Sequence, residues 1–333
     1  MVVNRRSLLT FIVLAFCLNV TAYAWDDVGH KLTTYIAWEV MTPEAREKAA
    51  RLLLKAPEDS DLSVVYTSFS TRSENSRRLE LFMYASTWPD VVRDRNFEVR
   101  NAKYHQGNWH YGAIFWEGQG TILADFPEPS GVAIPKLYEF EKILRDPGYK
   151  DGEKAIALAW FLHVAGDLHN PLHNASRVSA SEPKGDQGGN LFILEPEKAD
   201  GSWRMNLHSY WDSSISRTIR RKNDQCDQDY VGRIGRKFIR KHPVSGLSSR
   251  FRLGEYTAWN DEGFRLLPTG VYGNGLERET LPSKKYGKMA FRLSREQITL
   301  AGYRIGMTLN DIFAESPENG SSARWNNTKD DPK

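Results

Sequence analysis

A short stretch around residue 165 combines histidine and aspartate at a spacing that suits metal binding. His163 and Asp167 stand four residues apart, so on a helix their side chains share one face and can reach the same ion. Pro171 ends such a helix and turns the chain, which can bring His173 back to the same region. This stretch is the first candidate metal site of the sequence.

A second pair with the same spacing, His208 and Asp212, follows further along the chain. A lone pair of this kind often forms only a hydrogen bond, and that alternative applies to either pair taken by itself. The neighbours of His163 favour metal, because residues 157–162 are apolar and a carboxylate or imidazole buried without a partner is costly. Imidazole nitrogen and carboxylate oxygen, without thiolate, suit zinc or another borderline divalent metal.

Three further motifs complete an ordered pattern. Trp25 opens Trp-x4-His with His30, Asp90 closes Ser-x-Trp-x-Asp, and His110 lies within Trp-His-Tyr. They are followed by His-x3-Asp-x-His-x-Pro-Leu-His, Gly-Gly-Asn and Asn-Leu-His-x3-Asp, which ends at Asp212. This order closely resembles the S1/P1 (type I) nucleases, the trinuclear-zinc, single-strand-specific members of the zinc phospholipase C and nuclease superfamily. The resemblance implies an all-α fold, mainly helical with a small β-hairpin, of the phospholipase C/nuclease type.

The resemblance also implies three zinc ions. One is held by Asp90, His110, His163 and Asp167; the second shares Asp167 and adds His30 with the α-amino nitrogen and carbonyl oxygen of Trp25; the third is held by His173, His208 and Asp212. Three histidines are left as supporting, structural or surface residues, namely His105, His169 and His242. Of these, His169 is expected to support the site.

The reaction implied by the resemblance is hydrolysis of single-stranded RNA and DNA at the P–O3′ bond, which leaves 5′-phosphates. A 3′-nucleotidase activity on 3′-nucleotides is implied as well. Asp90 and Asp167 are the implied catalytic carboxylates, and Arg93 is implied at the phosphate, with a solvated surface arginine as its alternative. Tyr111 is the expected stacking partner of a base. The sequence departs from the fungal members near Ala113, where they carry an acidic residue that binds the base.

Two other functions remain open at this point. A zinc-dependent phospholipase C shares the fold and the cluster but usually has glutamate at the position of Asp212, so Asp212 and the Gly188-Gly189-Asn190 step favour the nuclease. A non-catalytic exported zinc-binding protein needs the ligands but has no use for Arg93.

Residues 1–24 have the features of a secretory signal peptide. Arg5 and Arg6 precede an apolar run over 8–20, and Ala22-Tyr23-Ala24 forms a small-x-small cleavage site. An uncleaved anchor is the alternative, but the run is short for a membrane span. We therefore expect a secreted or periplasmic protein that begins at Trp25 and makes no membrane contact after cleavage.

Charge and cysteine content limit the partners and the means of stabilisation. The chain holds 45 basic and 42 acidic side chains, and the leader contributes two arginines and no acid. The mature chain is thus nearly neutral, unlike a duplex-DNA binder with a strongly basic face. Cys226 alone survives maturation, so no intrachain disulfide can form and metal is the natural substitute. A monomer is expected.

The elements that must position these residues are mostly helices. Apolar spacing predicts helices over 28–54, with a second one opening at Thr42-Pro43-Glu44, over 80–88, 137–144, 153–168, 228–239, 255–266 and 294–313, and from Asn206. The apolar run 155–165 predicts a central helix buried on most sides. A hairpin is predicted over 188–203, a loop or mobile insertion over 57–78, and disorder over 316–333. The predicted organisation is one nuclease domain over 25–315.

Overall fold

The computed structural model describes residues 25–66, 71–128, 131–198, 201–222, 225–273 and 275–314 of the chain. The predicted leader and the predicted tail lie outside these ranges. Among the described residues, no helix is both long and apolar enough to cross a membrane.

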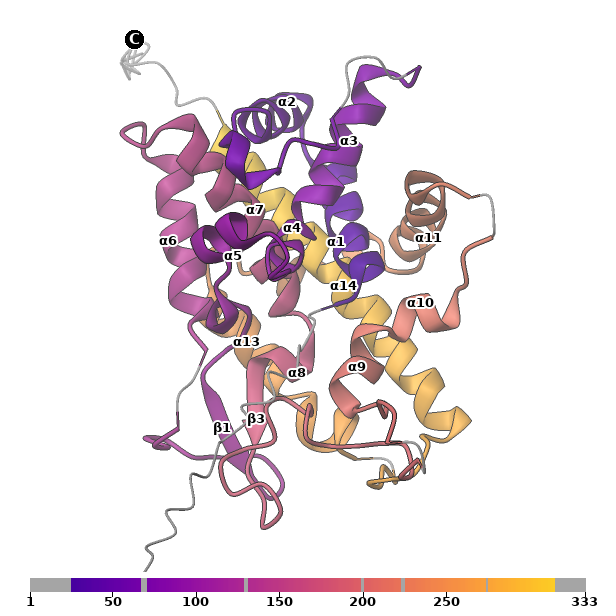
Figure 1. Cartoon of the computed structure of the whole chain (residues 1–333). Coiled ribbons are helices and arrows are strands. Elements are labelled where there is room, and N and C mark those ends of the chain that lie inside the picture. Colours follow the sequence, from indigo (N-terminus) through magenta and orange to yellow (C-terminus); the bar gives the residue numbers. More distant parts are fainter. Residues whose placement is uncertain are drawn as a thin grey trace, which may run out of the picture.

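Helices dominate the architecture, and a small sheet lies at one end of the molecule, below α8 and α13 in Figure 1. The longer helices are α1 (Asp27–Val40), α2 (Pro43–Leu53), α3 (Glu74–Ala85), α5 (Glu98–Tyr104), α6 (Ala133–Arg145), α7 (Asp151–Asp167), α9 (Leu207–Asp212), α11 (Asp227–Lys241), α13 (Tyr256–Phe264) and α14 (Lys284–Phe313). Shorter turns of helix are η1 (Glu58–Ser60), α4 (Trp88–Val91), η2 (Gly107–His110), α8 (Pro171–Asn174), α10 (Ser214–Thr218), α12 (Val244–Leu247), η3 (Ser248–Arg250) and η4 (Leu267–Val271). The predicted mainly helical fold is confirmed.

The central position of α7 follows from its composition. From Ala157 to Asp167 every residue is buried, because α6, α2, α14 and α1 pack around the helix. Each large apolar side chain buried in this way contributes about 1.5–3 kcal/mol to folding. The predicted central helix is therefore confirmed, and it carries His163 and Asp167 into the interior.

Helix α14 is the longest element and crosses the molecule behind α1 (Figure 1). The two helices approach closely at Gly302, where an added Cβ would lie 2.5 Å from Cβ of Ile36. The helix begins at Lys284 rather than at the predicted residue 294, since Ser283 caps it by accepting from the Tyr286 N–H (3.1 Å). The first turns carry Tyr286, Met289, Ala290 and Leu293 at helical spacing, so the apolar pattern extends to the cap and the predicted start was ten residues too late.

The small sheet has the strand order β2-β1-β3, with β1 (Ile114–Glu117) antiparallel to β2 (Thr121–Ile122) and parallel to β3 (Ala175–Arg177). The hairpin predicted over 188–203 takes a looser form. Its arms meet at one isolated bridge, Ile193 with Asn206, and at a hydrogen bond from Leu194 N–H to the Met205 carbonyl (2.9 Å). The regular strands thus lie elsewhere, since β1 and β3 pair across a long separation that local pattern does not reveal.

The segment predicted as a loop or mobile insertion over 57–78 is anchored at its start and helical at its end. Leu62 is fully buried, and the Ser60 carbonyl accepts from the indole of Trp88 (2.7 Å). Asp59 accepts from Tyr104 at the end of α5 (2.7 Å). Residues 67–70 lie outside the described part, and α3 already begins at Glu74.

Two apolar clusters fill the interior. The larger one includes most of α7 as far as Leu168, together with side chains of α1, α11 and α14, and the smaller one includes Leu172, Leu207 and Trp211. The chain passes from one cluster to the other between residues 168 and 172. The candidate metal residues therefore lie at the junction of the two clusters, where α7 ends and α8 begins.

Candidate metal centre

The first group of metal-binding side chains forms around the C-terminal end of α7. Nε2 of His163 lies 3.2 Å from Oδ2 of Asp167, and Nδ1 of His110 lies 3.1 Å from the same oxygen. The two ring nitrogens are 2.8 Å apart. All three side chains are buried and can hold one metal ion.

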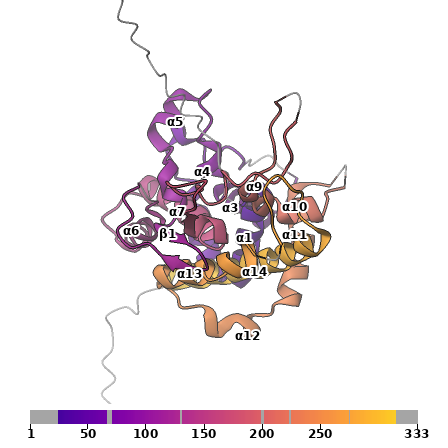
Figure 2. The ribbon, with the colours of Figure 1, turned by 90° about the horizontal axis from the view of Figure 1, so that it is seen from below.

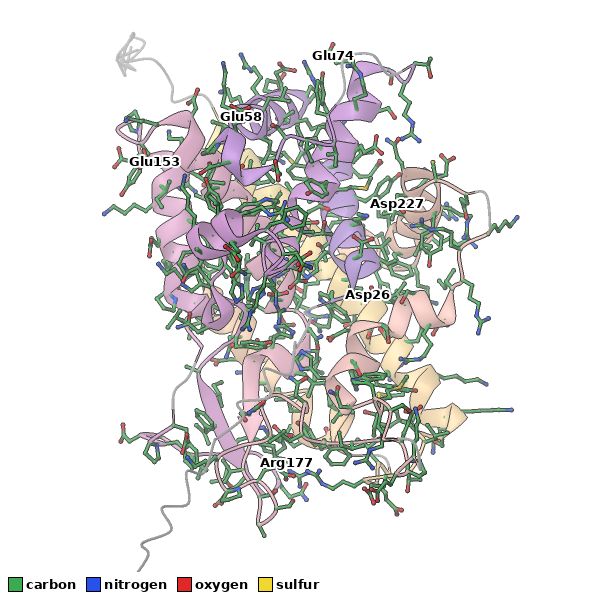
Figure 3. The ribbon with its side chains drawn as sticks, viewed as in Figure 1. Asp26, Glu58, Glu74, Glu153, Arg177 and Asp227 are labelled. Atoms are coloured by element: carbon green, nitrogen blue, oxygen red, sulfur yellow. The ribbon has the colours of Figure 1, made fainter. Side chains whose placement is uncertain are left out.

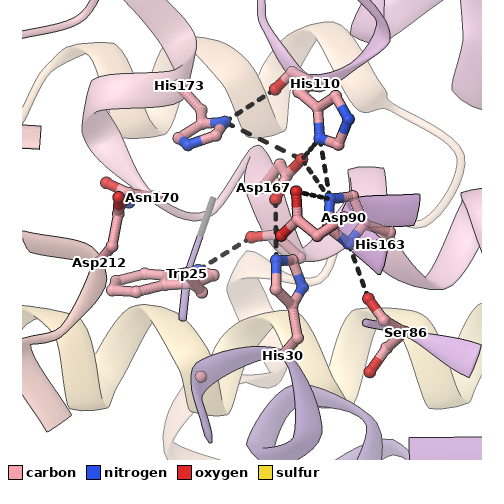
Figure 4. Close-up of polar contacts among 12 residues, drawn as sticks. Trp25, His30, Ser86, Asp90, His110, His163, Asp167, Asn170, His173 and Asp212 are labelled. Atoms are coloured by element: carbon pink, nitrogen blue, oxygen red, sulfur yellow. Dashed lines mark hydrogen bonds and ion pairs between the residues drawn. The ribbon is translucent and has the colours of Figure 1, made fainter. Parts of the chain in front are cut away.

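A second set meets the other oxygen of the same carboxylate, as the close-up shows (Figure 4). Nε2 of His30, from the first turn of α1, lies 3.3 Å from Oδ1 of Asp167. His30 also groups with Asp90 and His163 at metal-binding distances. Asp167 therefore stands between two sets of imidazoles, one at each oxygen.

Trp25 lies beside this set at the start of the described chain. Its side chain is fully buried, and its indole N–H donates to the carbonyl of Gly166 (3.0 Å). The next residue, Asp26, donates its backbone N–H to the Asp212 carbonyl (3.2 Å), and Figure 3 places Asp26 near the middle of the molecule. These contacts hold the backbone of Trp25 next to α7 and α9.

The third group combines His173, His208 and Asp212, all of them buried. Nε2 of His208 lies 3.6 Å from Oδ2 of Asp212, as expected from their helical spacing on α9. Asn170 donates from Nδ2 to Oδ1 of Asp212 (2.7 Å), which leaves Oδ2 facing the histidines. The structure thus brings together every residue that the sequence placed in this set.

Backbone carbonyls orient three of the imidazoles. His163 donates from Nδ1 to Ser86 (2.7 Å), His173 to His110 (2.8 Å), and His208 to Gly188 (2.7 Å). Such bonds fix the tautomer and direct Nε2 of each ring toward its group. Gly188 has φ +61°, and a Cβ there would lie 2.3 Å from the Leu172 carbonyl oxygen, so the close approach requires glycine.

Unpartnered buried atoms show that the residues present fit a metal. Both ring nitrogens of His30, Oδ1 of Asp167 and Nε2 of His173 are buried and make no hydrogen bond within the described part of the chain. Buried polar atoms without partners are rare in folded proteins. Divalent cations would satisfy one ring nitrogen of His30, Oδ1 of Asp167 and Nε2 of His173.

The charges of the site agree with that fit. Burial acts to raise the pKa of Asp167, but the imidazoles of His163 and His173 outweigh it and hold that pKa well below its usual value. Burial lowers the pKa of His30 and His110 and brings that of His173 to about 4. Burial acts in the same direction on His163, but Asp167 and Asp90 outweigh it and raise the pKa of His163. A metal ion would take the place of the protons in this group, because it binds the ionised carboxylate and neutral imidazoles.

The pKa of Asp212 is shifted in the opposite direction. Burial, together with the charges of Asp26 and Asp167, raises its pKa well above the usual value. With no cation beside it, an ionised carboxylate at this depth is costly. A divalent ion in the third group would reverse that balance.

Comparison with known proteins shows the family of the chain. A family model described as S1/P1 nuclease matches residues 25–314, nearly all of the described chain. The chain belongs to the S1/P1 nuclease family. The resemblance seen in the motifs is thereby confirmed.

Two plant proteins are similar to this family member. Endonuclease 1 of Arabidopsis thaliana is 27% identical over 169 residues, 48% of this chain and 50% of that protein. Endonuclease 2 of the same plant is 23% identical over 303 residues, 87% of this chain and 91% of that protein. The chain thus spans half the length of Endonuclease 1 in that alignment and most of Endonuclease 2.

The residues predicted to contact substrate lie beside the candidate metal-binding groups. Arg93 donates from Nη1 to Oδ1 of Asp90 (3.1 Å), and both side chains are partly exposed. The Tyr111 ring stacks on His173, with centroids 4.8 Å apart at 22°, so one face of the ring is already covered. Ala113 follows just before β1 and carries no polar group for a base.

His169 does not support the cluster in the way that was expected. Its Nδ1 donates to the Ala165 carbonyl (2.7 Å), and its Nε2 accepts from the buried Arg304 (2.8 Å). Arg304 also donates to Glu262 (2.5 Å). His169 therefore joins α7 to α13 and α14 and acts as a structural residue.

Sequence reasoning did not identify Asn170 or the carbonyl of Ser86, which orient ligand side chains. The sequence could have predicted a structural role for Asn170, because asparagine directly before Pro171 is a typical helix cap. Ser86 gave no such indication, because its side chain takes no part in the contact.

Removal of metal should destabilise the folded protein, because ions that bind only the native state shift unfolding. At a free zinc concentration one hundred times Kd, a single site adds about 2.7 kcal/mol. We expect calorimetry to show a lower Tm in excess chelator and recovery when zinc is restored. Asp212→Ala should reduce this zinc-dependent shift, whereas Asp229→Ala, at an exposed position on α11, should preserve it. Equal Tm values with and without chelator would contradict the metal assignment.

Proposed function

We propose that this S1/P1 family member is a zinc-dependent endonuclease that cuts single-stranded RNA and DNA at the P–O3′ bond. The products are 5′-phosphorylated strands, and the same site removes the phosphate of 3′-nucleotides. The strongest support is that three groups of histidine and aspartate side chains meet near the C-terminal end of α7. Asp167 contacts His163 of one group and His30 of another. Phosphodiester hydrolysis commonly uses metal ions placed close together.

Three zinc ions would be held in the sets that the motifs indicate. Asp90, His110 and His163 would hold the first, with Asp167 shared between the first and the second. His30 and the terminal amine and carbonyl of Trp25 would complete the second, and the third would take His173, His208 and Asp212. When bound, the ions lower the pKa of a bound water and neutralise charge on the phosphate.

The protein side chains then bind and orient the reactants. The Asp90 carboxylate is ionised, because the imidazoles of His163 and His110 outweigh the effect of burial and lower its pKa. It accepts a hydrogen bond from the attacking water and directs the oxygen lone pair toward phosphorus. Arg93, held against Asp90, donates N–H groups to the phosphate oxygens, which gain negative charge in the transition state.

The preference for single strands follows from the deep burial of the metal-binding side chains. Asp167, His163 and His173 are fully buried or nearly so. A phosphate of a nucleic-acid duplex must therefore be pulled out of the duplex to reach them. A paired and stacked base resists that displacement by a few kcal/mol. Tyr111 is the aromatic side chain on which an unpaired base would stack.

Export fits the same proposal. The leader over 1–24 would direct the chain out of the cytoplasm, and residues 25–315 would act as one monomeric nuclease domain in the periplasm or outside the cell. Zinc would replace the disulfides on which exported proteins often depend.

The proposal is tested with one labelled oligonucleotide offered as a single strand and as a duplex. We expect at least about tenfold faster cleavage of the single strand, 5′-phosphate ends, and no hydrolysis of phosphatidylcholine. Asp167→Asn removes the shared charge and should lower kcat by at least about a hundredfold. The exposed Asp229→Asn on α11 should stay within about twofold of wild type. Equal cutting of both forms, preference for the lipid, or a fully active Asp167→Asn would each contradict the proposal.

A free amino terminus at Trp25 is needed if its nitrogen binds zinc. An extension turns that amine into an amide, which has no available lone pair. We expect a chain with a tag before Trp25 to bind fewer zinc ions and to lose most activity, whereas protease removal of the tag restores both. Trp25→Ala with a free terminus should retain more zinc than the tagged chain. Full zinc content in the extended chain would exclude the chelate.

A further inference from the structure

The small hairpin of β1 and β2 starts directly beside the third metal group. The Gly112 N–H donates to the His173 carbonyl (2.7 Å), and the Tyr111 ring stacks on the His173 ring with centroids 4.8 Å apart. The start of α6 is held at the same place, because the Ala133 N–H donates to the Tyr111 carbonyl (2.9 Å). Figure 2 shows the molecule from the end at which β1 lies. The base of the hairpin is thus fixed next to a candidate metal ligand.

A cavity of about 210 Å³ opens along this hairpin. Its lining runs from Ala113 to Phe115 on one side and from Ile122 to Glu128 on the other. The volume is below the roughly 300–1,000 Å³ of cavities that hold a whole small ligand, so the space suits a single ring system. Because Ala113 follows Gly112 directly, one end of the cavity lies beside the third metal group.

A second connection joins the cavity to the same metal group. Gly185 lies against the aromatic wall of the cavity, since a Cβ added there would be 3.1 Å from Cε1 of the Phe115 ring. Three residues further on, the Gly188 carbonyl accepts from Nδ1 of His208 (2.7 Å). One loop therefore supports both the cavity and a candidate metal ligand, so a strand bound at the metal centre can reach the cavity.

The cavity offers an aromatic surface and a free carboxylate. The rings of Phe115 and Phe126 pack with their centroids 4.6 Å apart, and Phe126 is half-buried. Asp125 is exposed, and its carboxylate has no ion pair or hydrogen bond with the residues that the structure describes. Glu128 differs, because it pairs with Lys184 (3.2 Å). Asp125 is therefore available to accept hydrogen bonds from a ligand.

We propose that this cavity binds a second nucleobase, the neighbour of the base on Tyr111, which packs on Phe126 and donates hydrogen bonds to Asp125. This inference rests on the proposed function. Guanine fits best, because its N1–H and its exocyclic amine are adjacent donors and a carboxylate accepts two such bonds side by side. Uracil presents one N–H between two carbonyl oxygens, which a carboxylate repels. The cavity therefore favours cuts close to guanine over cuts within runs of uracil.

The test uses two single-stranded oligouridylates that differ only at the central position, which is guanine in one strand and uracil in the other. Wild-type protein should cut a bond within about two nucleotides of the guanine about three- to tenfold faster than the same bond in the uracil strand. Asp125→Asn should reduce this preference to within about twofold, because an amide both donates and accepts and so pairs with either base. Asparagine tolerates the φ of +60° at Asp125, so the variant should fold.

A second variant tests the aromatic surface. Phe126→Ala should lower the ratio of strand cleavage to 3′-mononucleotide hydrolysis about fivefold, because a mononucleotide has no neighbouring base to pack on the ring. Glu117→Gln is the matched control for Asp125→Asn, since it removes an exposed acid of the same hairpin that does not line the cavity. It should keep the guanine preference of wild type.

Equal cutting of the two strands by wild-type protein, an unchanged preference in Asp125→Asn, or loss of the preference in Glu117→Gln would overturn the second base site while leaving the nuclease proposal intact. A wild-type protein that cuts neither strand would overturn the proposed function and this inference with it.

Discussion

The buried carboxylate of Asp167 sets the constraint on which the metal centre depends. One of its oxygens lies 3.3 Å from His30, and the other lies within 3.2 Å of His110 and His163. A charge at this depth is tolerated only with compensating partners. The imidazoles of His163 and His173 compensate it in part, since they lower the pKa of Asp167, and divalent cations would complete the balance.

The fold delivers those partners from four distant parts of the chain. His30 comes from the first turn of α1, His110 from η2, His163 from α7 itself, and the third group from α8 and α9. Because α7 is apolar on all sides, the elements around it pack closely and hold the ligands at fixed positions. Carbonyl groups of Ser86, His110 and Gly188 then fix the ring orientations.

The sequence predicted those features of the fold and site that depend on residues close together in the chain. The spacing of His163 and Asp167, the cap at Thr42 and the apolar run of α7 all depend on neighbours within a few residues, and each has the predicted form. The pairing of β1 with β3 joins distant segments, which propensity does not encode. His169 shows the same limit, because its partner Arg304 lies 135 residues away and drew it into the core instead of the metal centre.

The account is tested most directly by locating the metals. Crystals of the mature chain grown with zinc would be measured on both sides of the zinc absorption edge, and an anomalous difference map would be calculated. The account predicts three peaks, two of them in contact with Asp167 and one among His173, His208 and Asp212. A map in which Asp167 contacts no metal, or in which the third group is empty at saturating zinc, would contradict it.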